Sequence, residues 1–315
     1  MDLQKEAFIW IINILRKNSI PFLISGGLAA NAYGSTREIR DFDIEIKNSD
    51  FQKIMNDFKP YTISGPEIYK SRAFENVLLK LNFNGQEIDI AGGDKSRIYN
   101  SNKQEWVNDS VDFKRFENKE IFCQLVSVMY PEDVIAYKSS HPRPEDLIDI
   151  EAISKYLNSE KNFNWIISVL KKHNVRFVIT GGLAAKSYGS PRPLNDIDID
   201  IHDKDLYLIL EDVKPYITFG PEQYKDERWD LLLMTLNHDG QDIDLSGGDT
   251  LKICDARTGK WMNNATNFSN TEEKEIFGLK VPVISKKDLV DYKSMLVGEH
   301  QQVDIQAVQN KLCIQ

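Results

Sequence analysis

Apolar positions near the N-terminus recur at the spacing of a helix. They are Phe8, Ile11, Ile12 and Leu15. This i, i+3, i+4, i+7 pattern predicts an amphipathic helix over about residues 3–16, and Asn18 and Pro21 end it. The short apolar run Phe22–Ser25 then predicts a strand, which stops at a Gly-Gly pair.

Two later stretches have the pattern of β-strands. Phe42–Ile46 alternates apolar and acidic residues, which predicts a strand with one buried face. Val77–Phe83 and Gln86–Ala91 flank Asn84-Gly85, a favoured pair for a two-residue hairpin turn. Helices are predicted at residues 50–58, 131–139 and 145–157, with an irregular stretch between the hairpin and residue 131.

The same pattern occurs a second time, 155 residues later. From Gly26 to Arg37 and from Gly181 to Arg192, nine of twelve positions are identical. The second copy has its own hairpin, across Asp239-Gly240, and its own closing helices at 286–295 and 301–312. The repeat therefore predicts two tandem copies of one domain.

The repeat also sets the expected boundaries and fold class. We predict domains at residues 1–158 and 159–315, joined by a polar turn near Asn158–Asn162. The order strand, helix, strand, helix, hairpin predicts an α+β fold, in which each domain is a small mixed sheet flanked by helices.

Composition narrows the class of protein. The formal net charge of −9 opposes nonspecific binding to nucleic acid and suits a cationic partner. No apolar run approaches the roughly 20 residues that span a bilayer, and the N-terminal helix lacks the features of a signal peptide. The three cysteines are scattered and fit a reducing compartment. We therefore expect a cytoplasmic protein that does not bind a membrane and is unlikely to bind nucleic acid.

Candidate chemistry lies in the alternating strand. Asp41 and Asp43 are two residues apart on a strand, so their side chains share one face. Converging carboxylates repel each other unless protons or a cation intervene, and Mg²⁺ prefers oxygen ligands. Asp89, in the second hairpin strand, reaches the same place if the two strands are neighbours. The corresponding acids of the second copy are Asp196, Asp198 and Asp244.

Each acid pair follows a Gly-Gly turn between a strand and a helix, a place where backbone N–H groups can bind phosphate. Three acids beside such a turn are typical of two-metal phosphoryl transfer. In that chemistry one metal holds a nucleoside triphosphate and the other lowers the pKa of the attacking hydroxyl. An isolated Asp-x-Asp is more often a solvated strand edge, but both copies keep all three acids, which favours a functional site.

The order Gly-Gly, thirteen residues, Asp-x-Asp and a later apolar-Asp-apolar strand resembles the nucleotidyltransferase superfamily (DNA polymerase beta-like). The most similar members are the lincosamide- and aminoglycoside-type enzymes and the minimal antitoxins. The resemblance implies Mg²⁺ and a nucleoside triphosphate, most simply ATP. It implies that the six aspartates ligate metal and that Asp89 and Asp244 act as general bases.

The resemblance also implies residues that contact the nucleotide phosphates. By the resemblance these are Gly26, Gly27 and Lys138 in the first copy and Gly181, Gly182 and Lys293 in the second. Their position near the motif makes Ser35, Arg37, Ser190 and Arg192 further candidates for phosphate contact. Many members have Gly-Ser where this chain has Gly-Gly, and a hydroxyl of Ser25, Thr180, Ser35 or Ser190 could replace the missing serine.

Several of these roles have a structural alternative. Each arginine could bind phosphate, the nearby acids or a partner in a structural salt bridge, and each lysine could simply be a surface residue. Glu45 and Asp200 lie two residues beyond the acid pairs and could be outer ligands or the solvated end of a strand.

The leading hypothesis is an enzyme that transfers a nucleoside monophosphate from a nucleoside triphosphate to a hydroxyl, with pyrophosphate leaving. The acceptor would be a small, antibiotic-like molecule or a protein. The alternatives are an antitoxin-type module that holds a partner protein, or a nucleotide sensor without turnover. We also expect the two copies to pack as an intramolecular pseudo-dimer.

Overall fold

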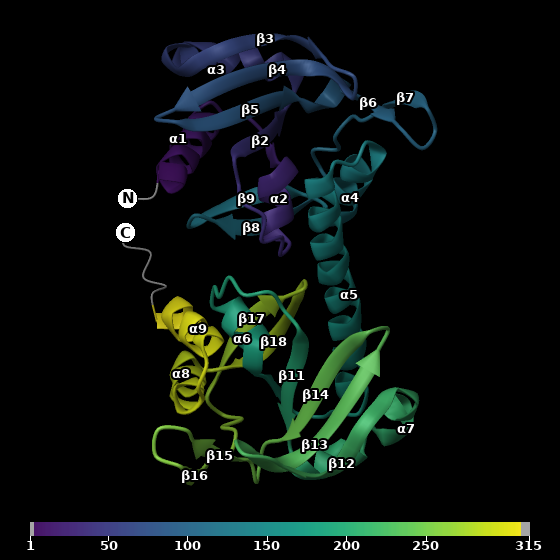
Figure 1. Ribbon diagram of the computed structural model, residues 1–315, viewed down its shortest axis with the longest axis vertical. Coiled ribbons are helices and arrows are strands. Elements are labelled where there is room, and N and C mark those ends of the chain that lie inside the picture. Colours follow the sequence, from purple (N-terminus) through teal and green to yellow (C-terminus); the bar gives the residue numbers. More distant parts are fainter. Residues whose placement is uncertain (1–2, 310–315) are drawn as a thin grey trace. The chain divides into compact units, whose positions relative to one another are not determined.

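The computed structural model describes residues 3–309, which divide into two compact units between Lys155 and Tyr156 (Figure 1). Both units are α+β, and each is built on one nine-stranded mixed sheet. Within the described residues, no helix combines the length and the apolar character needed to cross a membrane.

The first unit begins with the predicted amphipathic helix. Its helices are α1 (Leu3–Lys17), α2 (Gly26–Ala32), α3 (Phe51–Phe58), α4 (Pro131–Ser140) and the start of α5 (Pro144–Lys172). Its strands are β1 (Leu23–Ile24), β2 (Asp41–Ile46), β3 (Thr62–Lys70), β4 (Phe74–Phe83), β5 (Gln86–Gly92), β6 (Arg97–Asn100), β7 (Glu105–Asn108), β8 (Phe116–Ile121) and β9 (Gln124–Met129). They are ordered β7-β6-β4-β5-β2-β1-β9-β8, with β3 beside β4.

The second unit repeats this strand order. Its helices after α5 are α6 (Gly181–Ser187), α7 (Leu210–Val213), α8 (Lys286–Met295) and α9 (Glu299–Gln309). Its strands are β10 (Phe177–Ile179), β11 (Asp196–Ile201), β12 (Ile217–Lys225), β13 (Trp229–His238), β14 (Gln241–Gly247), β15 (Lys252–Asp255), β16 (Lys260–Asn263), β17 (Thr271–Ile276) and β18 (Leu279–Ile284). They are ordered β16-β15-β13-β14-β11-β10-β18-β17, with β12 beside β13.

The hairpin places the third acid beside the acid pair. Strand β5 returns from the Asn84-Gly85 turn and pairs in parallel with β2, so that Asp43 is in register with Asp89. Strands β11 and β14 pair in the same way, with Asp198 in register with Asp244. The alternate apolar side chains of all four strands are fully buried, which leaves the acids on the other face: Phe42, Ile44, Ile88, Ile90, Ile197, Ile199, Ile243 and Leu245.

The polar turn predicted near residues 158–162 is wrong, because these residues lie inside α5. The sequence between Pro144 and Lys172 contains no glycine and no further proline, so nothing in it breaks the helix. Its polar residues have helical and tertiary partners instead. The Asn162 amide donates to the Asn158 carbonyl (2.7 Å), and the Ser159 hydroxyl donates to Gln241 (2.7 Å).

The stretch predicted to be irregular holds four strands in each copy, β6 to β9 and β15 to β18. Most are four to six residues long, and the outermost strands are rich in exposed polar and charged side chains. Short strands at a sheet edge bury little surface, so their sequences lack a clear alternation. Of the final predicted helix, residues 310–312 lie outside the described residues, as does Cys313.

Candidate active site

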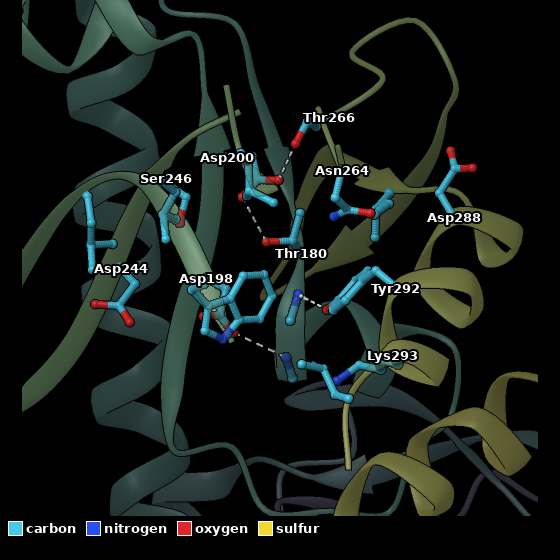
Figure 2. Close-up of a pocket in the computed structure, with 18 of the residues that line it drawn as sticks. Thr180, Asp198, Asp200, Asp244, Ser246, Asn264, Thr266, Asp288, Tyr292 and Lys293 are labelled. Carbon is cyan, nitrogen blue, oxygen red and sulfur yellow. Dashed lines mark hydrogen bonds between the residues drawn. The ribbon is translucent and has the colours of Figure 1, made fainter. Parts of the chain in front are cut away.

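A glycine turn contacts the central acid of each site. Gly26 and Gly181 have φ angles of +58° and +59°, which side chains rarely adopt. A Cβ on Gly26 would lie 1.8 Å from Asp43 Oδ2, and one on Gly181 would lie 1.7 Å from Asp198 Oδ2. Only glycine lets the backbone come this close to the carboxylate. The Gly182 N–H donates to Asp198 Oδ2 at 3.2 Å (Figure 2).

This contact gives a testable stability prediction. Gly181→Ala should lower the free energy of unfolding by about 2–3 kcal/mol, because the new methyl group meets both a carboxylate and an unfavourable φ. Gly182→Ala is the matched control, since its Cβ would meet nothing within 4 Å. It should be neutral or slightly stabilising when both variants are unfolded in denaturant. Equal losses in the two variants would contradict the contact.

The three predicted acids of the first copy do come together. One carboxylate oxygen from each of Asp41, Asp43 and Asp89 lies within 4.8 Å of the others. Among residues 3–309 this is the only set of three potential metal ligands at that spacing. A side chain that sequence analysis did not single out also enters this site, because Lys80 Nζ lies 2.9 Å from Asp89 Oδ2.

The acids of the second copy have the same strand register but a different neighbour. Thr235 replaces Lys80 opposite the third acid, and its hydroxyl hydrogen-bonds to Asp244. The other oxygen, Asp244 Oδ1, is buried without a hydrogen-bond partner. A buried carboxylate oxygen that accepts no hydrogen bond is costly unless a ligand compensates it.

The pKa values of the central acids show how strongly the neighbouring carboxylates repel one another. Burial, followed by repulsion from Asp41 and Asp89, raises the pKa of Asp43 to about 6. Burial, followed by repulsion from Asp196 and Asp244, raises the pKa of Asp198 to about 7. A divalent cation removes this repulsion, so the donor set suits a hard cation with oxygen ligands.

The raised pKa of Asp198 predicts how the metal-free protein depends on pH. The folded pKa is about 7 against an ordinary value of 3.8. The folded state therefore holds a proton that the unfolded state has lost, and stability falls as pH rises from about 4 to 7. Asp198→Asn stays neutral, so in EDTA at pH 8 it should melt about 5 °C above the wild type.

The same measurement at pH 5 is the control. There the difference in melting temperature should shrink by more than half, because folded Asp198 is then protonated in the wild type. Mg²⁺ at pH 8 should stabilise the wild type more than the variant. A melting difference that is the same at pH 5 and pH 8 would refute the assignment.

The predicted phosphate-binding side chains gather on a buried carboxylate that sequence analysis missed. Asp149 is fully buried and accepts from the Ser35 hydroxyl (2.6 Å), Arg37 Nε (3.2 Å) and Lys138 Nζ (2.9 Å). Arg37 therefore forms the structural salt bridge that was the alternative to phosphate binding. Lys138 is only 3% exposed, so the alternative of a surface lysine is wrong.

Asp304 plays the same part in the second copy. It accepts from Ser190 (2.6 Å), Arg192 (2.5 Å) and Lys293 (3.0 Å). Asp149 and Asp304 are themselves 155 residues apart, so the repeat contained the signal that identifies them.

These cations also lie close to the glycine turn and the acids. A Cβ on Gly27 would meet Arg37 Nη2 at 2.3 Å, which places the guanidinium against the turn. The positive charge of Lys138 lowers the pKa of Asp43, and that of Lys293 lowers the pKa of Asp198. In both acids burial and repulsion from the neighbouring acids raise the pKa by more. Each site therefore combines clustered acids with cations on its other side.

The acids two residues further along each strand are not a solvated strand end. Asp200 is 7% exposed and accepts from Thr180 (3.3 Å) and Thr266 (2.5 Å), as Figure 2 shows. Burial raises its pKa to about 6. Glu45 accepts from Ser25 (3.2 Å), and burial, then repulsion from Asp43, raises its pKa to about 8. The Ser25 and Thr180 hydroxyls are thus engaged with these acids.

A cavity of about 660 Å³ opens over the acids of the second copy. Its floor includes the glycine turn and the acids, and its walls come from β13, β14, α8 and the loop after β16 (Figure 2). The residues that line the cavity include Asp226, Trp229, Asp288, Asp291, Tyr292 and Lys293.

No protein-family profile matches the chain, and no curated protein matches its sequence. Similar solved structures include the Thermotoga maritima protein TM1012 (23% identity, TM-score 0.35, 42% of this chain and 78% of that one). Another is the lincosamide antibiotic adenylyltransferase LnuA with lincomycin bound (19% identity, TM-score 0.35, 48% and 96%). A third is the antibiotic-resistance factor ANT(2'')-Ia (15% identity, TM-score 0.37, 55% and 98%). TM1012 is described as a nucleotidyltransferase and LnuA as an adenylyltransferase.

Proposed function

We propose that the chain is a divalent-cation-dependent nucleotidyltransferase. It transfers a nucleoside monophosphate from a nucleoside triphosphate, most simply ATP, to a hydroxyl of a small molecule and releases pyrophosphate. The observation that carries this proposal is the three-acid set facing a glycine turn, which in the second copy opens into a cavity of about 660 Å³.

The residues of the second site fit a divalent cation. Asp196, Asp198 and Asp244 would hold it, since they offer crowded carboxylates and one buried oxygen without a partner. Such an ion neutralises phosphate charge and lowers the pKa of a bound hydroxyl. The Asp244 oxygen that does not hold the cation would take the proton of the acceptor hydroxyl.

The surrounding groups position the triphosphate. The Gly181 and Gly182 N–H groups donate to the Tyr292 hydroxyl (3.1 Å) and to Asp198 (3.2 Å), so the buried positive charge of Lys293 is the group that faces the triphosphate. The acceptor oxygen bonds to the α-phosphorus while the bond from that phosphorus to the bridging oxygen breaks, and pyrophosphate takes both electrons of the broken bond. Correct placement of the two reactants accounts for much of such catalysis.

The cavity wall suits a small, cationic, hydroxylated acceptor. Asp226, Asp288 and Asp291 add negative charge, and Trp229 and Tyr292 offer aromatic faces on which an ammonium group or a ring can rest. The net charge of −9 and the modest volume favour such a molecule over a polynucleotide.

The direct test uses the full chain, Mg²⁺ and each of the four common nucleoside triphosphates. Acceptors should include lincosamide and aminoglycoside antibiotics and a protein mixture. We expect pyrophosphate release together with a mass gain of one nucleoside monophosphate on a small acceptor, and loss of both in EDTA. Nucleotide binding without pyrophosphate release for every acceptor would instead support the nucleotide-sensing alternative.

A further inference from the structure

The two acid sites differ in the residue that faces the third acid across the hairpin. In the first copy Lys80 on β4 is in register with Asp89 on β5. In the second copy Thr235 on β13 is in register with Asp244 on β14. Directly opposed residues on one face of an antiparallel pair are close neighbours, so this exchange alters the charge inside the site.

In the first site the lysine acts as the compensating cation. Lys80 Nζ lies 2.9 Å from Asp89 Oδ2, and Asp89 Oδ2 belongs to a carboxylate that gathers with Asp41 and Asp43 within 4.8 Å. Three carboxylates this close repel one another unless protons or positive charge offset the repulsion, and here the ammonium group supplies positive charge. A divalent cation entering here would meet the ammonium group and lose part of the negative charge that should hold it.

In the second site no lysine occupies this position. The Thr235 hydroxyl is neutral, and Asp244 Oδ1 stays buried without a hydrogen-bond partner. Within residues 3–309 the acids of this copy do not reach the 4.8 Å spacing found in the first. The second site therefore has no lysine against its third acid and keeps an unused ligand atom.

A second exchange between the copies lies away from the hairpin, beside the lysines of α4 and α8. Lys138 in the first copy lies between two carboxylates, Asp146 at 2.8 Å and Asp149 at 2.9 Å. Lys293 in the second copy contacts one carboxylate, Asp304 at 3.0 Å, and the neutral amide of Gln301 at 3.1 Å. Asp146 is itself paired with Arg143 (2.8 Å), so this exchange replaces an ion pair by a neutral amide and leaves the net charge beside the lysine unchanged.

We infer that the two copies have different roles. The second copy binds the divalent cation together with the nucleoside triphosphate, whereas Lys80 prevents the cation from binding in the first copy. This inference rests on the proposed function, because it assigns the same acid chemistry to one copy. The first copy keeps all three acids, but the ammonium group of Lys80 takes the place of the metal.

Binding of Mn²⁺ to the full chain, followed by the electron paramagnetic resonance signal of the free ion, tests this assignment. We expect the wild type to bind one equivalent of Mn²⁺ and the Asp198→Asn variant to bind none. Lys80→Met keeps the side-chain length without the charge and should add a second equivalent, and the double variant Lys80→Met, Asp43→Asn should return to one. Lys80→Arg keeps the charge and should stay at one.

The reciprocal exchange tests the second site. Thr235→Lys should weaken Mn²⁺ binding at least tenfold, whereas Thr235→Met, which adds similar bulk without charge, should change it less than threefold. Thermal unfolding of each variant confirms that it is folded before Mn²⁺ binding is compared. Lys80→Arg and Thr235→Met then separate the effect of charge from that of size.

Three outcomes overturn the inference, and they differ in whether they also overturn the proposed function. Two equal Mn²⁺ sites in the wild type, or unchanged affinity in folded Thr235→Lys, would refute the division of roles and leave nucleotidyl transfer intact. No Mn²⁺ binding to the wild type, with nucleotidyl transfer also absent, would refute both proposals.

Discussion

Asp198→Asn should lower kcat/KM for nucleotidyl transfer at least about a hundredfold. The substitution keeps the shape of the side chain and an oxygen that can accept from the Gly182 N–H, but it removes the charge at the centre of the acid set. Pyrophosphate release at saturating and limiting nucleotide should show the loss. The lost charge is the one that lies against the glycine turn, so no neighbouring acid can take its place.

Asp242→Asn is the matched control for this prediction. Asp242 lies two residues before Asp244 on β14, has an exposed side chain and hydrogen-bonds to Asn237 (2.7 Å). Its removal should change kcat/KM less than threefold. If Asp198→Asn kept more than a tenth of wild-type activity, the second copy would not be the site of the reaction.

Asp304→Asn should produce the largest loss of stability among single charge substitutions. Asp304 is fully buried and is the carboxylate partner of Lys293 and Arg192. Asparagine preserves its volume but leaves these cations without a counter-charge in a buried place. We expect the free energy of unfolding to fall by about 3 kcal/mol, and the melting temperature to fall by about 6–12 °C.

An exposed ion pair on α8, the helix before the one that carries Asp304, provides the comparison. Lys287 and Asp291 pair across one turn of α8, and their side chains are 79% and 56% exposed. Asp291→Asn should change the free energy of unfolding by less than about 0.5 kcal/mol, because solvent screens this pair. Similar small effects in both variants, measured by denaturant unfolding, would show that the Asp304 network contributes little.

The acid sites were predictable because they rest on local periodicity. Alternation in β2 and β11 put each acid pair on one face, and the Asn84-Gly85 and Asp239-Gly240 turns returned the third acid to the neighbouring strand. The same turn also fixes Lys80 opposite Asp89, so the lysine could have been found by pairing residues outward from the turn. A lysine on an alternating strand normally indicates a solvated face, so the strand pattern alone does not mark Lys80 as part of a site.

Other features depended on contacts that periodicity does not encode. Asp149 meets Arg37 across 112 positions of sequence, and only the 155-residue repeat marks it. The segment 158–162 resembles a polar linker, yet helix α5 continues through it because no residue there interrupts the backbone hydrogen bonds. The edge strands β7 and β16 bury too little surface to leave a pattern of their own.

Retention of every acid in both copies does not by itself mean two equivalent sites. A duplicated domain can lose its metal site by gaining a positively charged side chain as well as by losing a ligand. Here that side chain, Lys80, lies on the strand next to the one that carries the third acid. Comparison of duplicated domains therefore needs the cross-strand neighbours of each acid, here Lys80 and Thr235, in addition to the acids.

The pairing of Lys80 with Asp89 also has an evolutionary consequence. A lysine codon becomes a threonine codon by one base change, so the charge that separates the two hairpins can be gained or lost in a single mutational step. Since the acids themselves remain in place, loss of this lysine would be enough for the first copy to bind the cation and become active. Selection on a new acceptor could recover this activity without rebuilding the site.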